Sequence, residues 1–551
     1  MRRVKRLPLA IVGGLSAIAV IVVLTVGPLG AGGTTPSPTA RPDGSEAAAA
    51  STAAPTTSSG DGPATPTPST GAPTSVATPL VDTAIVPVTQ FRTTRTSTDR
   101  DQVAEILAGT SERYDALELV AADAEAVLAG LDLDASTAGD RLILADDATA
   151  LTRDLAKHRK RLAFLRAEDV TPGVRALAWG KTALFGTARV RDLADWPLVV
   201  PLPSGPDGTV AFDPATTWTM FAAGDMMLDR GVYETVRVKK KGVDFPFDGG
   251  TAEVTGHCKD CSPLGWDTPY TKRTGNKGAV RDLIERADLA IANFENPAPD
   301  RWKWHTSKTI FSADPGIIEG IADAGIDWVS LANNHIGDQG RTGVLQTIKN
   351  VEKYGLAHAG AGKNATAART PSTFEFDDTT VAVLAYDAIY KPYHATASRV
   401  GSAAFTIKNV SADVKKAREA GADVVIVFPH WGREYQYAPT SRQREQAHAI
   451  IDAGADMIIG NHAHYAAAME AYQGKPIWYA LGNFVFDQTW SEPTMEGITL
   501  ELTFHGGDLA QIRMRPHLIL DKAQPNFLDP AGDGKAVLDP IWKASKGLLP
   551  W

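Results

Sequence analysis

From Thr217 onward, strand-like and helix-like segments alternate along the chain, and this alternation constrains the fold more than any other feature. Buried strands are indicated by apolar runs such as TWTMFAAGD, ADLAIANFE and ADVVIVFPH. Helices are indicated by the segments between such runs, for example AVRDLIERA and SRQREQAHAIIDAG. Strands that alternate with helices of this length predict a layered α/β domain whose strands are buried on both faces.

Polar side chains stand just beyond the C-terminal end of several of these apolar runs. They are Asp225, Glu295, Asn334, His335, His430, His462 and His464. In open α/β sheets, ligands bind outside the carboxyl ends of the strands, because the loops converge there. We therefore expect these side chains to share one crevice.

Two histidines one residue apart, in the stretch IGNHAHY, suggest a metal site. Side chains two apart on an extended segment point the same way, so we expect His462 and His464 both to face the crevice. Imidazole, carboxylate and amide groups together suit manganese, iron or zinc. Six of the seven side chains make a set large enough for two metals, namely Asp225, Glu295, Asn334, His430, His462 and His464. Taken singly, each residue has an alternative role in hydrogen bonding or helix capping.

The first thirty residues have the pattern of an export signal. Arg2, Arg3, Lys5 and Arg6 precede about twenty mostly apolar residues, long enough to cross a bilayer as a helix. We expect residues 1–30 to anchor the protein, with the basic flank in the cytoplasm and the remainder outside the membrane. The alternative is a signal peptide cleaved near 30–33, which would give a secreted protein.

Composition divides the rest of the chain. Residues 31–79 are rich in Thr, Ser, Pro, Ala and Gly, which is typical of a disordered, extended linker. Residues 80–202 predict a small accessory α/β domain, with amphipathic stretches over 99–120 and 146–167. The main α/β domain should cover 217–525, and a C-terminal extension 526–551. The formal net charge of −9 argues against a general nucleic-acid-binding surface.

The two cysteines of the chain, Cys258 and Cys261, lie in the segment GHCKDCS. Outside the cytoplasm their oxidation is expected, so we predict a disulfide that closes a short loop. Metal binding is the alternative, but the chain has no second cysteine pair to complete a zinc site.

The strand exits also carry a family resemblance. The chain contains, in this order, FAAGDMMLDRGV, ANFENP, SLANNHIGDQG, FPHWGREYQYAP, AIIDAGADMIIGNHAHY and YALGNFVFD. These segments, within about 217–505, resemble the successive motifs of the bacterial capsule synthesis CapA family, also called the poly-gamma-glutamate capsule biosynthesis family. The family belongs to the calcineurin-like metallophosphatase superfamily. The resemblance therefore implies a four-layer α/β/β/α sandwich with a dinuclear metal centre.

The resemblance also implies roles for individual residues. Asp225 and His464 would bind the first metal, Glu295 would bridge the two, and Asn334, His430 and His462 would bind the second. His335 would act as the acid or the electrostatic donor near the leaving group of the substrate. The implied partners are an acidic envelope polymer such as poly-gamma-glutamate and a membrane-bound synthesis or export complex.

Other polar residues near these segments have supporting roles in this interpretation. Asp338 and Glu434 are expected to orient His335 and His430 by accepting a hydrogen bond from each ring, with loop capping as the alternative. Asn483 is expected to contact substrate or to close a turn.

Two departures from the superfamily pattern bear on function. Met227 stands where metallophosphatases usually have a histidine, and NFEN stands where they usually have GDxxD. A thioether is a poor ligand for a hard divalent cation. Two functions are compatible with these residues. One is metal-dependent hydrolysis or transfer at a phosphoester or amide, and the other is non-catalytic binding that exports or anchors an acidic polymer.

Overall fold

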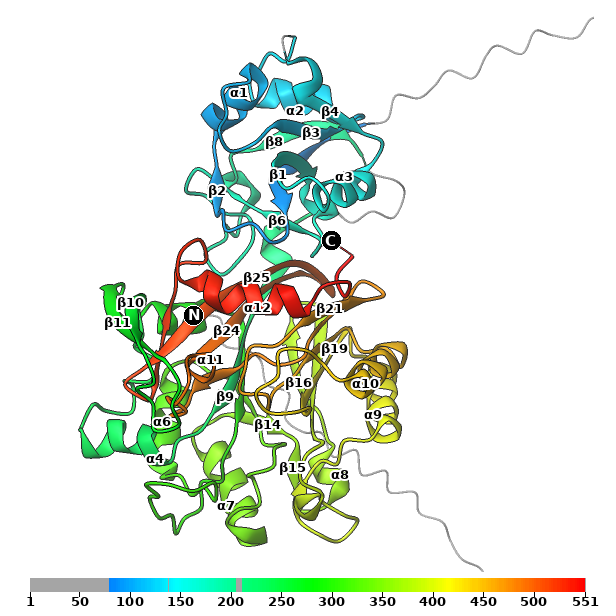
Figure 1. The fold of residues 1–551 in the computed structure, drawn as a ribbon. Helices are drawn as coiled ribbons and strands as arrows, with labels where there is room; N and C mark the ends of the chain where they lie inside the picture. The colour runs from blue at the N-terminus through cyan, green and yellow to red at the C-terminus, as the bar shows by residue number, and fades with distance from the viewer. Residues whose placement is uncertain (1–78, 137, 205–210, 551) are drawn as a thin grey trace, which may run out of the picture. The chain divides into compact units, whose positions relative to one another are not determined.

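The computed structural model describes residues 79–136, 138–204 and 211–550 (Figure 1). The anchor expected at 1–30 and the linker expected at 31–79 lie outside these residues, apart from Pro79. Within the described ranges, no helix has both the length and the apolar character needed to cross a membrane.

A six-stranded sheet forms within residues 80–203, where the sequence predicts an α/β region. Its strand order is β4-β3-β5-β1-β6, and β8 pairs with β1. The strands are β1 (Leu80–Gln90), β3 (Ala116–Val120), β4 (Leu142–Ala145), β5 (Arg161–Arg166), β6 (Val174–Ala176) and β8 (Val199–Pro203). The helices are α1 (Arg100–Ala108), α2 (Ala124–Gly130) and α3 (Ala148–Leu155). Two short strands, β2 (Ser97–Thr98) and β7 (Ala178–Trp179), pair with each other.

The amphipathic stretches expected over 99–120 and 146–167 each divide into a helix and a strand. Gly109 ends α1 with a φ of 75°, a left-handed conformation that glycine adopts without strain. Residues 116–119, which follow it, are all buried in β3. In the same way, α3 gives way to β5. Short apolar runs fit either secondary structure, and burial in the sheet decides between them here.

A ten-stranded sheet begins at Thr217, with the order β11-β10-β26-β25-β24-β9-β12-β13-β14 and β23 beside β9. The strands β9, β12, β13 and β14 run parallel. The bounds are β9 (Thr217–Met226), β10 (Thr251–Cys258), β11 (Thr268–Gly275), β12 (Leu289–Phe294), β13 (Trp328–Ser330), β14 (Ala357–Ala359), β23 (Asn483–Val485), β24 (Glu496–His505), β25 (Asp508–Leu520) and β26 (Gln524–Phe527). Cys258 and Cys261, which the sequence predicts to form a disulfide, are joined at the hairpin of β10 and β11.

A second six-stranded sheet has the order β16-β17-β19-β20-β22-β21, with β17, β19, β20 and β22 parallel. The bounds are β16 (Ser372–Phe376), β17 (Thr379–Asp387), β19 (Val424–His430), β20 (Met457–Ile459), β21 (Met469–Tyr472) and β22 (Lys475–Trp478). A two-stranded pair joins β15 (Ala361–Gly362) to β18 (Gly401–Ser402).

Helices cover the outer faces of these two sheets (Figure 1). The residues that follow β9 contribute α4 (Arg230–Tyr233), α5 (Ala279–Arg286), α6 (Ile318–Asp323), α7 (Gly340–Lys353), α8 (Ala365–Ala368), α9 (Ile407–Glu419), α10 (Ser441–Asp452), α11 (Glu492–Met495) and α12 (Gly534–Ala544). Successive strand residues point to opposite faces, so each strand feeds two cores. In β9, Ala222 packs between the sheets and Phe221 packs under α5, α6 and α7. In β19, Ile426 faces the other sheet and Val425 faces α9 and α10.

Trp218 ties the two sheets together. Its ring stacks on Phe504 of the same sheet at 3.9 Å between centroids, and on Phe376 of the other sheet at 4.6 Å. The indole nitrogen donates a hydrogen bond to the Gly506 carbonyl at 2.8 Å. This residue therefore both fills the inter-sheet core and satisfies its own polar group.

The region expected as a C-terminal extension, 526–551, is packed into the fold. Val537, Leu538 and Ile541 of α12 belong to the core between the sheets. Ser545 joins this region to β21, because its hydroxyl oxygen accepts a hydrogen bond from the Met469 amide at 2.8 Å.

Trp218→Ala should lower the free energy of unfolding by about 3–5 kcal/mol, because it removes a fully buried aromatic side chain and leaves a cavity. Guanidinium denaturation followed by circular dichroism measures this change. Trp266→Ala is the matched control, since Trp266 is 49% exposed, and it should change stability by about 0.5 kcal/mol or less. Equal losses in both variants would contradict the role assigned to Trp218.

Candidate metal centre

Carboxylates from one sheet meet histidines from the other at the carboxyl ends of their parallel strands. Asp225 lies at the end of β9, and Glu295 directly follows β12. His430 ends β19, and His462 and His464 follow β20. The two sheets thus contribute different ligand types to one place, which explains why residues so distant in sequence converge.

The ligand atoms form two groups that share one residue. Glu295, His430 and His462 offer atoms within 4.8 Å of one another, and so do Asp225, Glu295 and His464. All of these side chains are buried. The shared carboxylate of Glu295 stands where a bridging ligand between two metals would be needed, as its assigned role requires.

The chemistry of Glu295 fits bound cations. The residue is 0% exposed, and neither of its carboxylate oxygens accepts a hydrogen bond. The ring nitrogens of His430 and His464 lie 3.4 Å and 3.8 Å from Oε1. A buried carboxylate without donors is costly unless a positive charge compensates it. Divalent metals between these oxygens and the imidazoles would supply that charge.

The sequence suggested that His462 and His464 lie on an extended segment. In the structure this segment is not extended. β20 ends at Ile459, and both histidines have positive φ values, 89° and 54°. This left-handed backbone conformation costs free energy for a residue with a side chain and is concentrated at functional sites. The turn sends each histidine into a different ligand group instead of placing the two side by side.

Amide side chains orient the histidines. Oδ1 of Asn334 lies 2.7 Å from Nε2 of His430, and Oδ1 of Asn483 lies 2.9 Å from Nδ1 of His464. Asn483 is therefore held against a histidine ligand, a contact that neither expected role named. Its own side-chain amide donates to the Thr494 carbonyl at 2.9 Å, which fixes its orientation.

Asn293 is a site residue that the sequence interpretation missed. It is fully buried, donates to Oδ1 of Asp225 at 2.7 Å, and lies 3.3 Å from Nδ1 of His430. Its own Oδ1 has no partner among the described residues. The signal was present in ANFENP, but Asn293 precedes the strand exit by two residues. Only the parallel register that sets Asn293 opposite Asp225 reveals its role.

Burial and neighbouring charges set the protonation of the ligands. Burial, followed by repulsion from His430 and His464, holds the pKa of His462 well below its ordinary value, so this ring is neutral. Burial opposes ionisation of Asp225, but contact with His464 and His430 lowers the pKa of that carboxyl overall. Burial likewise opposes protonation of His464, yet Glu295 and Asp225 raise its pKa to about 9. A metal bound by His464 would therefore have to displace a proton from it.

His335 lies beside the ligand groups without belonging to them. Its Nδ1 is 3.0 Å from Oδ2 of Asp338, and its ring lies 4.3 Å from that of Phe311. Asp338 also accepts hydrogen bonds from the Phe311 amide and the Tyr393 hydroxyl. These contacts match the orienting role predicted for Asp338.

Glu434, in contrast, is exposed, and none of its described contacts is with His430. The His430 ring instead contacts Asn293, Asn334, His462 and Glu295. The expected orienting role of Glu434 is therefore not supported, because the loop after β19 carries the side chain to the surface.

Met227 is fully buried in a small apolar cluster with Phe311, Phe486 and Ile519. Its sulfur accepts a hydrogen bond from the Asp229 amide at 3.1 Å. The side chain thus forms part of the apolar surroundings, and the group of Asp225, Glu295 and His464 has no fourth ligand from this position.

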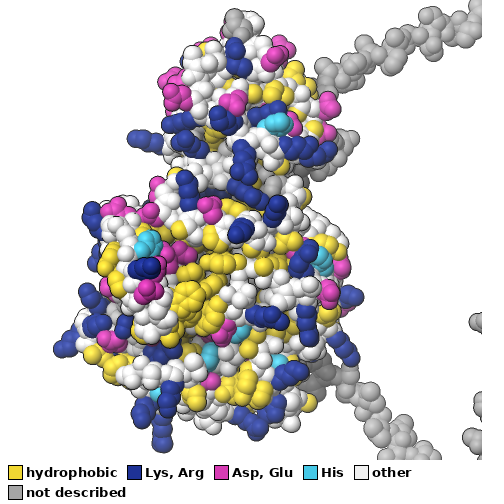
Figure 2. Space-filling view, in the orientation of Figure 1, with side chains coloured by type: hydrophobic (Ala, Val, Ile, Leu, Met, Phe, Trp, Pro, Cys, Tyr) yellow, Lys and Arg dark blue, Asp and Glu magenta, His cyan; other side chains and the backbone are white. Residues whose placement is uncertain are grey.

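Aromatic side chains flank the centre on the side of His464. The ring of Tyr435 lies 6.1 Å from His464, and Trp490 packs against Tyr435 at 5.0 Å. Trp266, from the disulfide-closed hairpin, lies 6.4 Å from Trp490. Figure 2 shows a broad patch of hydrophobic side chains over the region of β24 and α11. This aromatic wall borders one side of the centre.

Comparison with known proteins identifies the family of the chain. The family described as "Bacterial capsule synthesis protein PGA_cap" matches residues 219–488. The chain is 30% identical over 340 residues to the "Capsule biosynthesis protein CapA" of Bacillus anthracis, covering 60% of this chain and 74% of that protein. It is 32% identical over 230 residues to the "PGA biosynthesis protein CapA" of Bacillus subtilis, covering 40% and 60%.

These matches place the chain in the class of bacterial capsule and poly-gamma-glutamate synthesis proteins. The chain belongs to the bacterial capsule synthesis family, as the sequence resemblance predicted. Among solved structures, a calcineurin-like phosphoesterase of Bacillus subtilis, YfkN, is similar at 13% identity, with a TM-score of 0.32 over 60% of this chain and 97% of that one.

Single substitutions should remove metal in a pattern that the two ligand groups dictate. Elemental analysis of the purified wild type should find about two equivalents of manganese, iron or zinc. His462→Ala and His464→Ala should each lose about one equivalent, and Glu295→Ala should lose both, since both groups need it. His158→Ala is the control, because its side chain is 50% exposed and far along the chain from these ligands. A wild type that takes no metal even after reconstitution would overturn this assignment.

Glu496 should make stability depend on pH. It is 6% exposed, and burial, followed by repulsion from Glu492, raises its pKa to about 8. The neutral form is thus favoured in the folded state. The stability that depends on neutral Glu496 is fully present below the ordinary pKa of glutamate, about 4.3. It is lost as the pH rises through about 8. Glu496→Gln should therefore match the wild-type Tm at pH 4 and exceed it at pH 9. A Tm lowered equally at both pH values would contradict this explanation.

Proposed function

We propose that this protein works outside the membrane in the synthesis or processing of an acidic cell-envelope polymer, with a dinuclear metal centre that hydrolyses or transfers at a phosphoester or amide bond. The observation that carries the proposal is the carboxylate of Glu295, which is buried, without hydrogen-bond donors and shared by both ligand groups. Two bound cations would stabilise this buried anion beside the rings of His430 and His464, whose nitrogens lie 3.4 Å and 3.8 Å from Oε1.

Bound metals would activate the substrate, and a residue of the chain would deliver the proton. When bound, the metals supply Lewis-acid polarisation of the scissile group. His335 stands beside the ligands, and its ring is held by Asp338. A histidine fixed in this way by a carboxylate can deliver a proton from its other nitrogen to a leaving group. The aromatic wall and the apolar cluster around Met227 keep water away from one side of the centre.

The sequence and the names of relatives support the proposed polymer and the proposed membrane location. One relative is named for capsule biosynthesis and another for PGA biosynthesis. We infer poly-gamma-glutamate, or a related acidic polymer, as the substrate class. Residues 1–30 have the pattern of an anchor, and 31–79 that of a tether, so we infer that the catalytic region is displayed outside the cell membrane near a synthesis or export complex.

A second candidate is a non-catalytic protein that binds and exports or anchors the polymer through the same surface. The observation in its favour is Met227, whose side chain supplies apolar packing where the superfamily pattern has a ligand. This candidate keeps the metal centre as a structural or binding element.

His335→Ala distinguishes the two functions. If His335 is the proton donor, turnover should fall by about 10²–10⁴-fold while metal content stays at the wild-type level. The measurement is kcat on chromogenic phosphomonoesters, phosphodiesters and gamma-glutamyl anilides, with metal content determined on the same samples. Asp338→Asn should cost about 10–100-fold by loosening the ring. His158→Ala again serves as the control. No turnover of any of these substrates by the metal-loaded wild type would favour the non-catalytic candidate.

A further inference from the structure

A polar cavity away from the metal centre, which we call the arginine pocket, lies among β6, β25 and α12. Its volume is about 330 Å³, and none of the metal ligands lines it. Five arginines do so, with one acidic residue, Asp529; they are Arg92, Arg95, Arg175, Arg513 and Arg515. Figure 2 shows Lys and Arg side chains, in dark blue, gathered near β25 and β6. The pocket is thus strongly positive in a chain whose net charge is negative.

Arg175 is the unusual member of this set. It lies on β6 and is only 8% exposed, and its buried Nε has no hydrogen-bond partner among the described residues. Burial, and then repulsion from Arg513, lower its pKa to about 9. A buried guanidinium without an acceptor is costly, so proteins rarely keep one for stability.

The carboxylate of Glu501, whose charge attracts Arg175, is already occupied by other hydrogen-bond donors. Its Oε2 accepts hydrogen bonds from Arg515 at 2.6 and 2.9 Å and lies 3.5 Å from Arg513. Its Oε1 accepts from the amide and hydroxyl of Thr187 at 2.8 and 3.1 Å. The Glu501 carboxylate thus contacts two arginines and the loop of Thr187. The pocket therefore has more positive than negative charge.

Apolar groups form the rest of the pocket wall. Phe91, Met514, Leu538 and Trp542 line it. The guanidinium of Arg92 lies 4.9 Å above the Trp542 ring, a cation–π contact that holds it at the pocket. A ligand that suits this lining carries negative charge on short hydrocarbon stems. A bare phosphate would leave the apolar wall without contacts.

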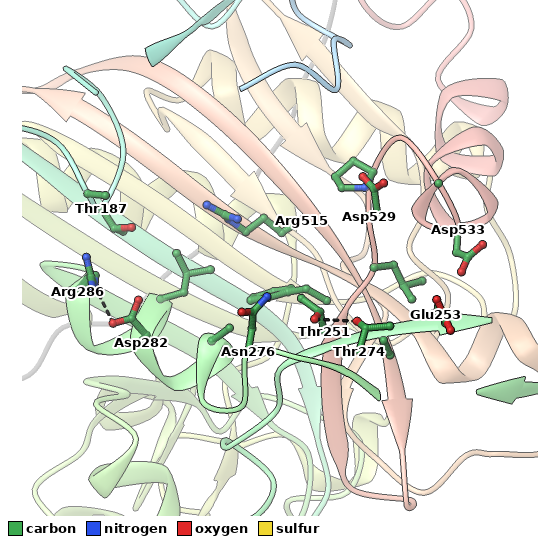
Figure 3. Close-up of a pocket in the computed structure, with 18 residues that line it drawn as sticks. Thr187, Thr251, Glu253, Thr274, Asn276, Asp282, Arg286, Arg515, Asp529 and Asp533 are labelled. Carbon is green, nitrogen blue, oxygen red and sulfur yellow. Dashed lines mark hydrogen bonds and ion pairs between the residues drawn. The ribbon is translucent and has the colours of Figure 1, made fainter. Parts of the chain in front are cut away.

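An adjoining cavity of about 650 Å³ shares Arg515, Asp529 and Pro530 with the arginine pocket but has the opposite character (Figure 3). Its other charged lining residues are Glu253, Asp282, Asp533 and Arg286, and Arg286 is paired with Asp282 at 2.7 Å. An anionic ligand is therefore favoured on the arginine side alone.

We propose that the arginine pocket is a second binding site, and that it takes carboxylate groups of an acidic peptide chain. Arginine presents a planar fork that binds a carboxylate through two parallel hydrogen bonds. Glutamyl side chains place such carboxylates on methylene stems, which match the apolar wall. This site stands on its own lining residues and is independent of the metal centre.

Isothermal titration calorimetry on the full chain, with penta-gamma-glutamate and penta-alpha-glutamate as probes, tests the proposal. At least one pentapeptide should bind, and its affinity should fall as the salt concentration rises. Arg175→Met should lower this affinity by about thirtyfold or more. Arg92→Met, at the rim, should also weaken it. Arg341→Met removes the same charge from an exposed helix position and should leave the affinity unchanged. Glutarate should bind more weakly than either chain, because it offers fewer carboxylates.

Two further measurements separate a binding role from a structural one. The Tm of Arg175→Met should equal or exceed that of the wild type, since the buried Nε has no hydrogen-bond partner to lose among the described residues. The His462→Ala, His464→Ala double variant should bind the pentapeptide normally, so failure of the metal centre and failure of this pocket give different results. Unchanged affinity in both Arg175→Met and Arg92→Met, or binding of inorganic phosphate without binding of either peptide, would overturn the proposal.

Discussion

The face-to-face packing of two sheets is the constraint on which the rest of this structure depends. The ten-stranded sheet carries Asp225 and Glu295, and the six-stranded sheet carries His430 and leads into His462 and His464. Neither sheet alone holds a complete ligand group. The inter-sheet core, with the Trp218 stack within it, sets the distance between the carboxylates and the imidazoles. Metal bound there would in turn join the sheets, so that binding and stability are coupled.

Close backbone approaches make this packing specific at the centre. A side chain at Gly224 would place its Cβ 1.9 Å from the Gly482 carbonyl, so only glycine allows β9 and the segment before β23 to meet. The amide of Asp225 donates to that same carbonyl at 3.0 Å. Contacts between backbone atoms thus help to fix the position of Asp225.

Two buried charged groups with unsatisfied hydrogen-bonding atoms mark the proposed ligand sites. Elsewhere the fold pairs its buried charges: Arg515 reaches Glu501, and Arg189 reaches Asp288 at 3.0 Å. The oxygens of Glu295 and Nε of Arg175 have no hydrogen-bond partner among the described residues, although the rings of His430 and His464 lie 3.4 Å and 3.8 Å from Glu295. Because an uncompensated charge is expensive in a low-dielectric interior, each indicates a missing ligand of opposite sign. The first calls for cations, and the second for an anion.

The sequence by itself determined the alternation of strands and helices, the polar strand exits and the family, because periodicity and motif order are local properties of the chain. It did not reveal Asn293, whose role depends on lying opposite Asp225 in a parallel pair, or the exposure of Glu434. It also placed His462 and His464 on an extended segment, whereas two left-handed residues separate them into different groups. Only the tertiary structure decided these features, and the pairing state of Arg175, because strand register, backbone turns and burial arise from contacts between segments far apart in the chain.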